Sequence, residues 1–175
     1  MRALQARGTH VIGLSRRPSE ADEHVEVDVA DREAVDAAAA GVLERHPRID
    51  LLVNNAGVGA RDSFLDADPD VIEQVIRVNY LGAVWTTRAF LPGLGRGAHV
   101  VNIVSVAGSV ASGPYSASKH AQLAFSRSLA IELAPRGVLV HTVNPGFVET
   151  PGFPQRGSRL GPLLSRVVDR GRQVR

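Results

Sequence analysis

The stretch VVNIVSVAGSVASGPYSASK, residues 100–119, decides the fold. Its apolar first part, residues 100–104, predicts a buried strand, and the small residues after Ser105 predict a loop. Tyr115 and Lys119 lie four positions apart at the start of a predicted helix, so both side chains lie on one helix face. A hydroxyl, a phenol and an ammonium are thereby brought to one place, which indicates a catalytic site.

The rest of the chain repeats this strand–helix pattern. Helices are expected after two N-cap residues, Asp31 and Asp68, and from Tyr115 to just before Pro135. Residues 2–7 are interpreted as the last turns of a helix that Gly8 closes. Apolar runs predict further strands at residues 9–14, 25–29, 49–53 and 138–143. This alternation predicts an α/β fold, a doubly wound and mostly parallel sheet with helices on both faces.

Composition narrows the class of protein. The 175 residues suit one domain, residues 1–175, with residues 151–175 as a substrate-loop and tail region. A net charge of +2 is too small to indicate nucleic acid as a partner, and no apolar run approaches the roughly 20 residues that span a bilayer. The absence of cysteine excludes a thiol nucleophile and fits a cytoplasmic protein. Six scattered histidines show no metal-ligand spacing, so no metal is expected; they are His10, His24, His46, His99, His120 and His141.

Polar clusters follow most of the predicted strands. They contain Ser15 and Arg16, Asp28, residues 54–57, Ser105, and residues 144–150. In a doubly wound sheet, ligands bind beyond the carboxyl ends of the strands. The sequence therefore places one ligand site at this edge of the sheet.

Four motifs in this order resemble those of the short-chain dehydrogenases/reductases. They are Asn54-Asn55-Ala56-Gly57, the helical Asn79, Tyr115-Ser116-Ala117-Ser118-Lys119, and Pro145-Gly146 with Thr150. The resemblance extends to about Pro151. It implies a Rossmann-type sheet, a nicotinamide dinucleotide cofactor, and an oxidoreductase that interconverts a carbonyl and a secondary alcohol by hydride transfer.

The resemblance also implies catalytic roles. Tyr115 would act as general acid or base, with Lys119 lowering the pKa of the phenol. Ser105 would polarise the substrate oxygen, and Asn79 would hold a water that relays protons to Lys119. Alternatives remain open: Ser109 and Ser112 compete with Ser105, and Asn79 could be only a buried helix residue. Tyr115 and Lys119 alone could be an accidental pair on an exposed helix.

Cofactor residues follow from the same resemblance. Ser15 stands where NAD-binding sheets usually carry an acid, and the guanidiniums of Arg16 and Arg17 could pair with a 2′-phosphate, which favours NADP over NAD. The alternative is a solvated arginine pair in a polar turn. The remaining predicted contacts are Asp28 and Val29 beside the adenine, Asn55, Ala56 and Gly57 under the ribose, and Tyr115, Lys119, Pro145, Gly146, Val148 and Thr150 toward the nicotinamide.

Three departures from the family pattern set up a second hypothesis. The sequence shows neither the Gly-rich turn nor the strand that precedes it, it stops before the family's final strand, and Ser105 lies only 10 residues before Tyr115. The alternative function is thus a truncated, catalytically silent module that binds NADPH weakly.

Expected partners are a small carbonyl or alcohol and other copies of the chain. Phe153, Leu160, Leu163 and Leu164 lean toward an apolar substrate. The helices that begin near Asp68 and Tyr115 carry apolar residues that would allow a homodimer or homotetramer.

Overall fold

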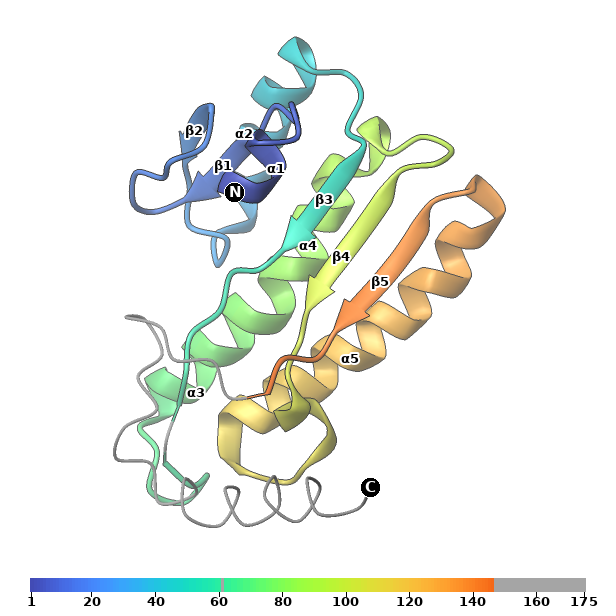
Figure 1. Ribbon diagram of the computed structural model, residues 1–175. Coiled ribbons are helices and arrows are strands. Elements are labelled where there is room, and N and C mark those ends of the chain that lie inside the picture. Colours follow the sequence, from blue (N-terminus) through green and yellow to red (C-terminus); the bar gives the residue numbers. More distant parts are fainter. Residues whose placement is uncertain (61, 147–175) are drawn as a thin grey trace.

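The computed structural model describes residues 1–60 and 62–146 and contains two parallel sheets (Figure 1). One sheet pairs β1 (Ile12–Ser15) with β2 (Glu23–Glu26). The other has the order β3 (Leu51–Asn54), β4 (His99–Ile103), β5 (Leu139–Val143). The predicted parallel α/β architecture is confirmed, with strand bounds that differ from the sequence prediction by up to three residues.

Local signals in the sequence explain where the helices begin. The Asp31 carboxylate accepts hydrogen bonds from the backbone N–H groups of Glu33 and Ala34, and α2 (Arg32–Arg45) follows. Asp68 caps α3 (Pro69–Ile76) in the same way, with Pro69 in the first turn. The short α1 (Arg2–Gln5) precedes Gly8, whose positive φ of 77° ends the turn.

The predicted helix after Asp68 continues beyond α3 through a π-helical turn, η1 (Arg77–Leu81), into α4 (Gly82–Phe90). After β4, a 3-10 turn, η3 (Val106–Ser109), leads to α5 (Gly113–Leu133), which begins two residues earlier than expected. Two further 3-10 turns are η2 (Leu91–Gly93) and η4 (Ala134–Arg136). None of the helices in the described ranges is long and apolar enough to cross a bilayer.

The long helices α2, α4 and α5 lie behind the strands in Figure 1, on one face. The cause is the direction of the crossovers: β2 to β3, β3 to β4 and β4 to β5 all run the same way across the molecule, and right-handed crossovers then place their helices on the same face. The predicted doubly wound, mostly parallel sheet is confirmed in an incomplete form, as two small sheets within residues 1–60 and 62–146. On β5 the exposure alternates, with Leu139 and Val143 exposed.

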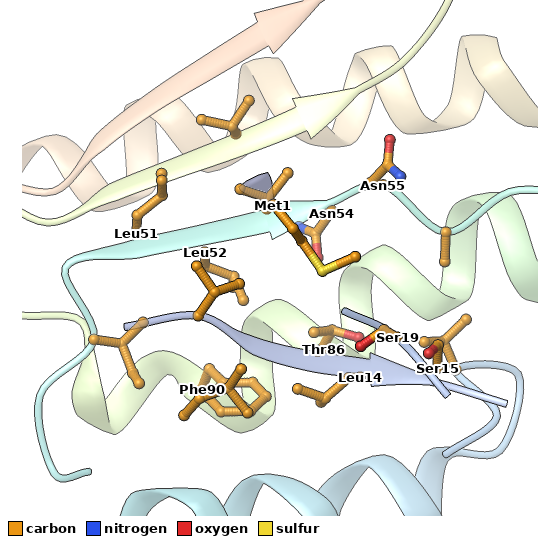
Figure 2. A pocket seen from close by; sticks show the side chains of 18 of the residues that line it. Met1, Leu14, Ser15, Ser19, Leu51, Leu52, Asn54, Asn55, Thr86 and Phe90 are labelled. Carbon is orange, nitrogen blue, oxygen red and sulfur yellow. The ribbon is translucent and has the colours of Figure 1, made fainter. Parts of the chain in front are cut away.

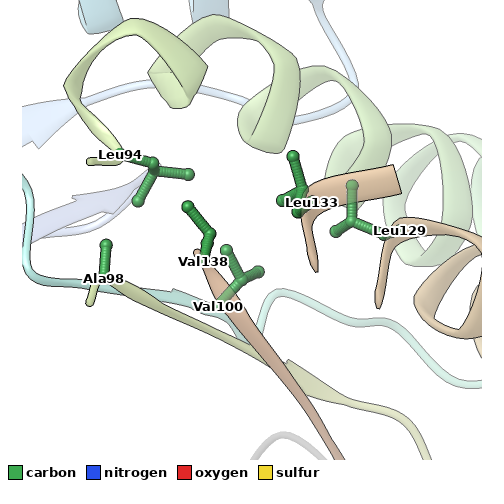
Figure 3. Close-up of a cluster of buried hydrophobic side chains, with 6 residues drawn as sticks. All are labelled: Leu94, Ala98, Val100, Leu129, Leu133 and Val138. Carbon is green, nitrogen blue, oxygen red and sulfur yellow. The ribbon is translucent and has the colours of Figure 1, made fainter. Parts of the chain in front are cut away.

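Two apolar clusters join the helices to the sheets. In the first, Val100 and Val138 pack with Leu129 and Leu133 of α5 (Figure 3). In the second, Ala39 and Val42 of α2 pack with Phe90 of α4, against half-buried residues of both sheets. The three-stranded sheet is therefore tied mainly to α5, and the two-stranded sheet to α2.

A groove separates the two sheets, because β1 and β3 do not pair with each other. Its volume is about 1390 Å³, and Met1 and Leu4 near the start of the chain line it. Figure 2 shows Leu14 of β1 on one side of this groove and Leu51 and Leu52 of β3 on the other. The groove ends at the carboxyl edge of the strands, where the polar clusters lie.

Candidate active site

Ser105 lies just beyond the carboxyl end of β4. Its Oγ accepts a hydrogen bond of 3.1 Å from the Ala107 backbone N–H, which fixes the start of η3. The Val106 backbone N–H donates to the Pro145 carbonyl oxygen at 3.1 Å. The end of β4 is thus joined to the segment after β5, so Ser105 and the Pro145-Gly146 pair are neighbours as predicted.

Tyr115 and Lys119 stand one turn apart near the start of α5, and the Lys119 Nζ lies 6.0 Å from the centroid of the Tyr115 ring. Gly113, in the first turn, has a φ of 63°, and a Cβ built there would lie 2.6 Å from the Asp62 carbonyl oxygen. Only glycine fits this position without displacing residue 62. A glycine therefore allows α5 to begin where Tyr115 meets the end of β4.

Burial governs the protonation of both groups. It raises the pKa of the Tyr115 phenol, and a hydrogen bond with Ser105 acts in the opposite direction with a smaller effect. Burial also lowers the pKa of Lys119 to about 8. The net effect on the Tyr115 phenol is a raised pKa, because desolvation dominates, and the expected lowering of that pKa by Lys119 stays a prediction.

Lys119 is held by groups that the sequence analysis did not identify. Its Nζ donates to the Ile103 carbonyl oxygen at 3.0 Å and to Gln122 Oε1 at 2.7 Å. Gln122 is fully buried, and its Nε2 finds no hydrogen-bond partner among the described residues. Lys119 is also the single lysine of the chain, beside 19 arginines. That imbalance is a sequence signal for a position where arginine cannot replace lysine.

Asn79 is fully buried within the π-helical turn. Its Oδ1 accepts from the Val58 N–H at 2.8 Å, and its Nδ2 donates to the Val58 carbonyl oxygen and to Ser118 Oγ, each at 2.9 Å. π-Helical turns occur frequently at functional sites because they redirect single side chains. Here the turn aims Asn79 so that it joins the segment after β3 to α5.

The Asn-Asn-Ala-Gly segment reaches the same place. A Cβ built on Gly57 would lie 3.4 Å from Asn79 Oδ1 and 3.8 Å from Lys119 Nζ. Residues from β3, η1 and α5 therefore converge although 62 positions separate Gly57 from Lys119 in the sequence.

The predicted adenosine contacts gather at the end of β1. An ion pair of 3.6 Å joins Arg16 Nη1 to Asp28 Oδ2, and the Ser15 hydroxyl donates to the Arg17 carbonyl oxygen. The groove is lined by seven of the predicted cofactor residues, Ser15, Arg16, Asp28, Val29, Asn55, Ala56 and Gly57. Arg17 is exposed outside this lining. Val148, Thr150 and the predicted substrate-loop and tail region, residues 151–175, lie outside the described residues.

Comparison with known proteins shows the family. The profile of the short chain dehydrogenase family matches residues 3–160. The chain belongs to the short-chain dehydrogenase family. It is 42% identical over 128 residues to dehydrogenase/reductase SDR family member 7B of Xenopus laevis, a match that covers 70% of this chain and 40% of that protein.

Solved structures of short-chain dehydrogenases share the fold. One from Burkholderia cenocepacia in complex with NADP is 35% identical, with a TM-score of 0.77, over 86% of this chain and 66% of that one. Another from Brucella ovis, with a partially ordered NAD, is 28% identical, with a TM-score of 0.75, over 85% and 77%. The chain therefore spans less than half the length of the Xenopus relative and about two thirds to three quarters of these structures.

Beneath the candidate site of this short-chain dehydrogenase lies a buried polar chain that sequence reasoning missed. Asn54 Nδ2 donates to Asn102 Oδ1 at 2.8 Å, Asn102 Nδ2 donates to Ser126 Oγ at 2.9 Å, and Ser126 meets Thr142 at 2.6 Å. It links β3, β4, α5 and β5. Asn102 breaks the apolar pattern of its strand, and that break was the available signal.

Proposed function

We propose that the protein is an NADP(H)-dependent oxidoreductase that reduces a small carbonyl compound to a secondary alcohol, or runs the reverse reaction. The observation that carries the proposal is the hydrogen-bonded pair of Ser105 and Tyr115 with the buried Lys119 ammonium beside the phenol ring. A hydroxyl and a phenol side by side can hold one carbonyl oxygen between them.

The described residues fit a nicotinamide dinucleotide. The groove is lined at its carboxyl edge by small and polar residues, and Lys119 is close to its wall at Gly57. The adenosine half would be held by Ser15, Arg16, Arg17, Asp28, Val29, Asn55, Ala56 and Gly57. The nicotinamide half would be held by Tyr115, Lys119, Pro145 and Gly146, together with Val148 and Thr150. When bound, the cofactor supplies or accepts the hydride.

The chain's own residues would then handle the substrate oxygen and the proton. Ser105 would donate a hydrogen bond to the carbonyl oxygen, and Tyr115 would donate its proton to that oxygen as charge develops on it. Because burial raises the pKa of Tyr115, the phenol carries its proton at neutral pH and could donate it, although a higher pKa makes it a weaker acid. Lys119 is mainly charged below its pKa of about 8. Its ammonium would stabilise the phenolate that forms when Tyr115 gives up its proton, in a place where burial has removed water.

Asn79 would act on this site by position. Its side-chain amide already bonds Val58 and Ser118, so it would fix the backbone beside Lys119. A water that relays protons would then bind to neighbouring carbonyl groups. The NADP preference rests on Arg16 and Arg17 and on the hydroxyl, in place of a carboxylate, at Ser15.

The direct test follows the hydride. The protein is incubated with NADPH deuterated at the nicotinamide C4 and with a panel of apolar ketones, and products are analysed by mass spectrometry. We expect deuterium on the carbinol carbon of at least one product, with NADPH preferred over NADH. Bound cofactor without transfer to any member of the panel contradicts the proposal.

The open groove favours a second candidate, a module that does not bind cofactor. The edges of β1 and β3 that face it are paired by no strand among the described residues. Fluorescence titration of the 175-residue chain with NADPH separates the two. Undetectable binding supports the silent module, whereas micromolar binding contradicts it.

A further inference from the structure

Three side chains that are far apart in the sequence meet at the edge of the two-stranded sheet opposite to the cofactor residues. His10 precedes β1, Glu23 begins β2, and His46 is the C-cap residue of α2. Glu23 Oε1 lies 2.9 Å from His10 Nε2 and 2.7 Å from His46 Nε2. The ligand atoms of all three side chains lie within 4.8 Å of one another.

We propose that His10, Glu23 and His46 form a binding site for a divalent transition-metal ion, with Zn²⁺ as the representative ion. Two imidazole nitrogens and one carboxylate oxygen are the donors that Zn²⁺ accepts, and water completes such a set in an open four-coordinate site.

Binding of the ion requires a modest rearrangement: the imidazole nitrogens of His10 and His46, within 4.8 Å of each other, would close, and the two contacts of Glu23 Oε1 would open. Zn–N and Zn–O bonds of roughly 2.0–2.2 Å in tetrahedral geometry put neighbouring ligand atoms about 3.3 Å apart. The two contacts at Glu23 Oε1 would therefore open by about half an ångström. The imidazole rings of His10 and His46 already lie beside each other, with centroids 5.3 Å apart and planes tilted by 32°.

The backbone holds the three residues in place. The N–H of Glu23 bonds the Val11 carbonyl oxygen, and the Val11 N–H donates to the Asp22 carboxylate at 2.8 Å, so the residue after His10 is bound to the start of β2. The His46 N–H donates to the Val42 carbonyl oxygen at 2.8 Å and closes α2. A site built on an ordered backbone loses less conformational freedom when the ion binds.

Arg45 has two opposing effects on binding of the ion. Its Nη2 lies 3.3 Å from Glu23 Oε2, and its Nη1 donates to the Gly41 carbonyl oxygen. The guanidinium thus holds one carboxylate oxygen and leaves Oε1 to the ion, while its charge lowers the affinity. The His10 side chain is 52% exposed and those of Glu23 and His46 are 31% exposed, which leaves an entry path and room for the water ligand.

Such an ion would tie three elements together: the segment before β1, the start of β2 and the end of α2. It would lie at the opposite edge from Ser15 and Asp28. The inferred role is therefore structural, and it does not rest on the oxidoreductase function.

The test titrates the untagged, chelator-treated chain with Zn²⁺ by calorimetry, and with Co²⁺ by visible absorption. We expect one ion per chain, intense four-coordinate Co²⁺ bands, and a higher melting temperature with Zn²⁺. Glu23→Gln, His46→Asn and His10→Asn should each weaken Zn²⁺ binding about tenfold or more. The exposed His10 variant keeps the test valid if either of the other substitutions prevents folding.

A matched control exists at the His99–His141 pair, where Nδ1 of His99 lies 2.8 Å from Nε2 of His141. In the part of the chain that the structure describes, no carboxylate forms a hydrogen bond or ion pair with either ring. His99→Asn should leave Zn²⁺ binding unchanged. The proposal is overturned by absence of binding below millimolar Zn²⁺, by affinity that the three variants leave unchanged, or by loss of the ion in His99→Asn.

Discussion

The three-stranded sheet and the helices packed on it enclose a set of buried polar groups, whereas two ion pairs around the two-stranded sheet lie at the surface. Asn54, Asn102, Asn79 and Lys119 are all buried and joined to partners from other elements. In the segments around the two-stranded sheet, the Arg16–Asp28 and Arg2–Glu20 pairs are exposed. Buried polar groups are costly to leave unpaired, while exposed ion pairs contribute little. The difference indicates that the half with the proposed catalytic residues, the catalytic half, is rigidly specified. The half with the proposed cofactor-selecting residues, the surface half, can change at small cost.

The largest effect is expected at the buried centre of the catalytic half. Lys119→Met removes the ammonium beside Tyr115, so turnover in the active protein should fall by about a hundredfold or more. Steady-state assays with saturating NADPH measure this loss. Arg127→Met, an exposed position on the same helix, is the control and should retain full activity. Equal activity of Lys119→Met and the unsubstituted protein would contradict the proposed role of Lys119 in turnover.

The buried polar chain gives the next effect. Asn102→Ala deprives Asn54 and Ser126 of a partner and should lower the free energy of unfolding by about 1–3 kcal/mol. Urea denaturation measures it. The matched substitution in the other half, Glu20→Gln in the exposed pair with Arg2, should cause no measurable change. Similar losses in both variants would remove the contrast between the halves.

A substitution in the surface half should change the cofactor specificity and leave the stability of the protein almost unchanged. Arg16→Ser removes one guanidinium from the predicted 2′-phosphate contact and should raise KM for NADPH about tenfold while leaving KM for NADH unchanged. Kinetic comparison of the two cofactors shows the result. A parallel rise for both cofactors would assign Arg16 to general binding and count against the NADP preference.

The smallest effect is a shift in titration. Because Lys119 is the single lysine, reductive ¹³C-methylation places one side-chain label in the chain, and NMR can follow its pKa. We expect a value near 8, below the ordinary 10.5. The unfolded chain then binds the extra proton between these values, so the unfavourable contribution of buried Lys119 to stability declines as pH rises from 8 to 10.5. Titration near 10.5 would show that the ammonium is solvated.

Local signals in the sequence predicted much of the fold and of the catalytic centre. Asp31 and Asp68 cap helices as expected, because capping depends on residues two or three positions away. Ser105, Tyr115 and Lys119 meet as the strand–loop–helix pattern predicted, and Ser105 is the serine bonded to Tyr115. Their catalytic roles stay predictions.

Other features depend on packing between distant segments. The π-helical turn at Asn79 follows from its contacts with Val58 and Ser118, which no helical periodicity encodes. His10, Glu23 and His46 are separated by 13 and 23 positions and belong to three elements, so spacing gave no sign of a metal site. The placement of the long helices on one face came from the crossover directions, which require the strand order.

One paired measurement tests the central claim, that Tyr115 is the proton donor of a hydride-transfer enzyme. The chain has two tyrosines, and Tyr80, which packs edge-on against Phe125, provides the matched control. Turnover and NADPH affinity are measured in parallel for Tyr115→Phe and Tyr80→Phe. We predict that Tyr115→Phe abolishes turnover and retains NADPH affinity, whereas Tyr80→Phe preserves both. Turnover that survives in Tyr115→Phe would contradict the account.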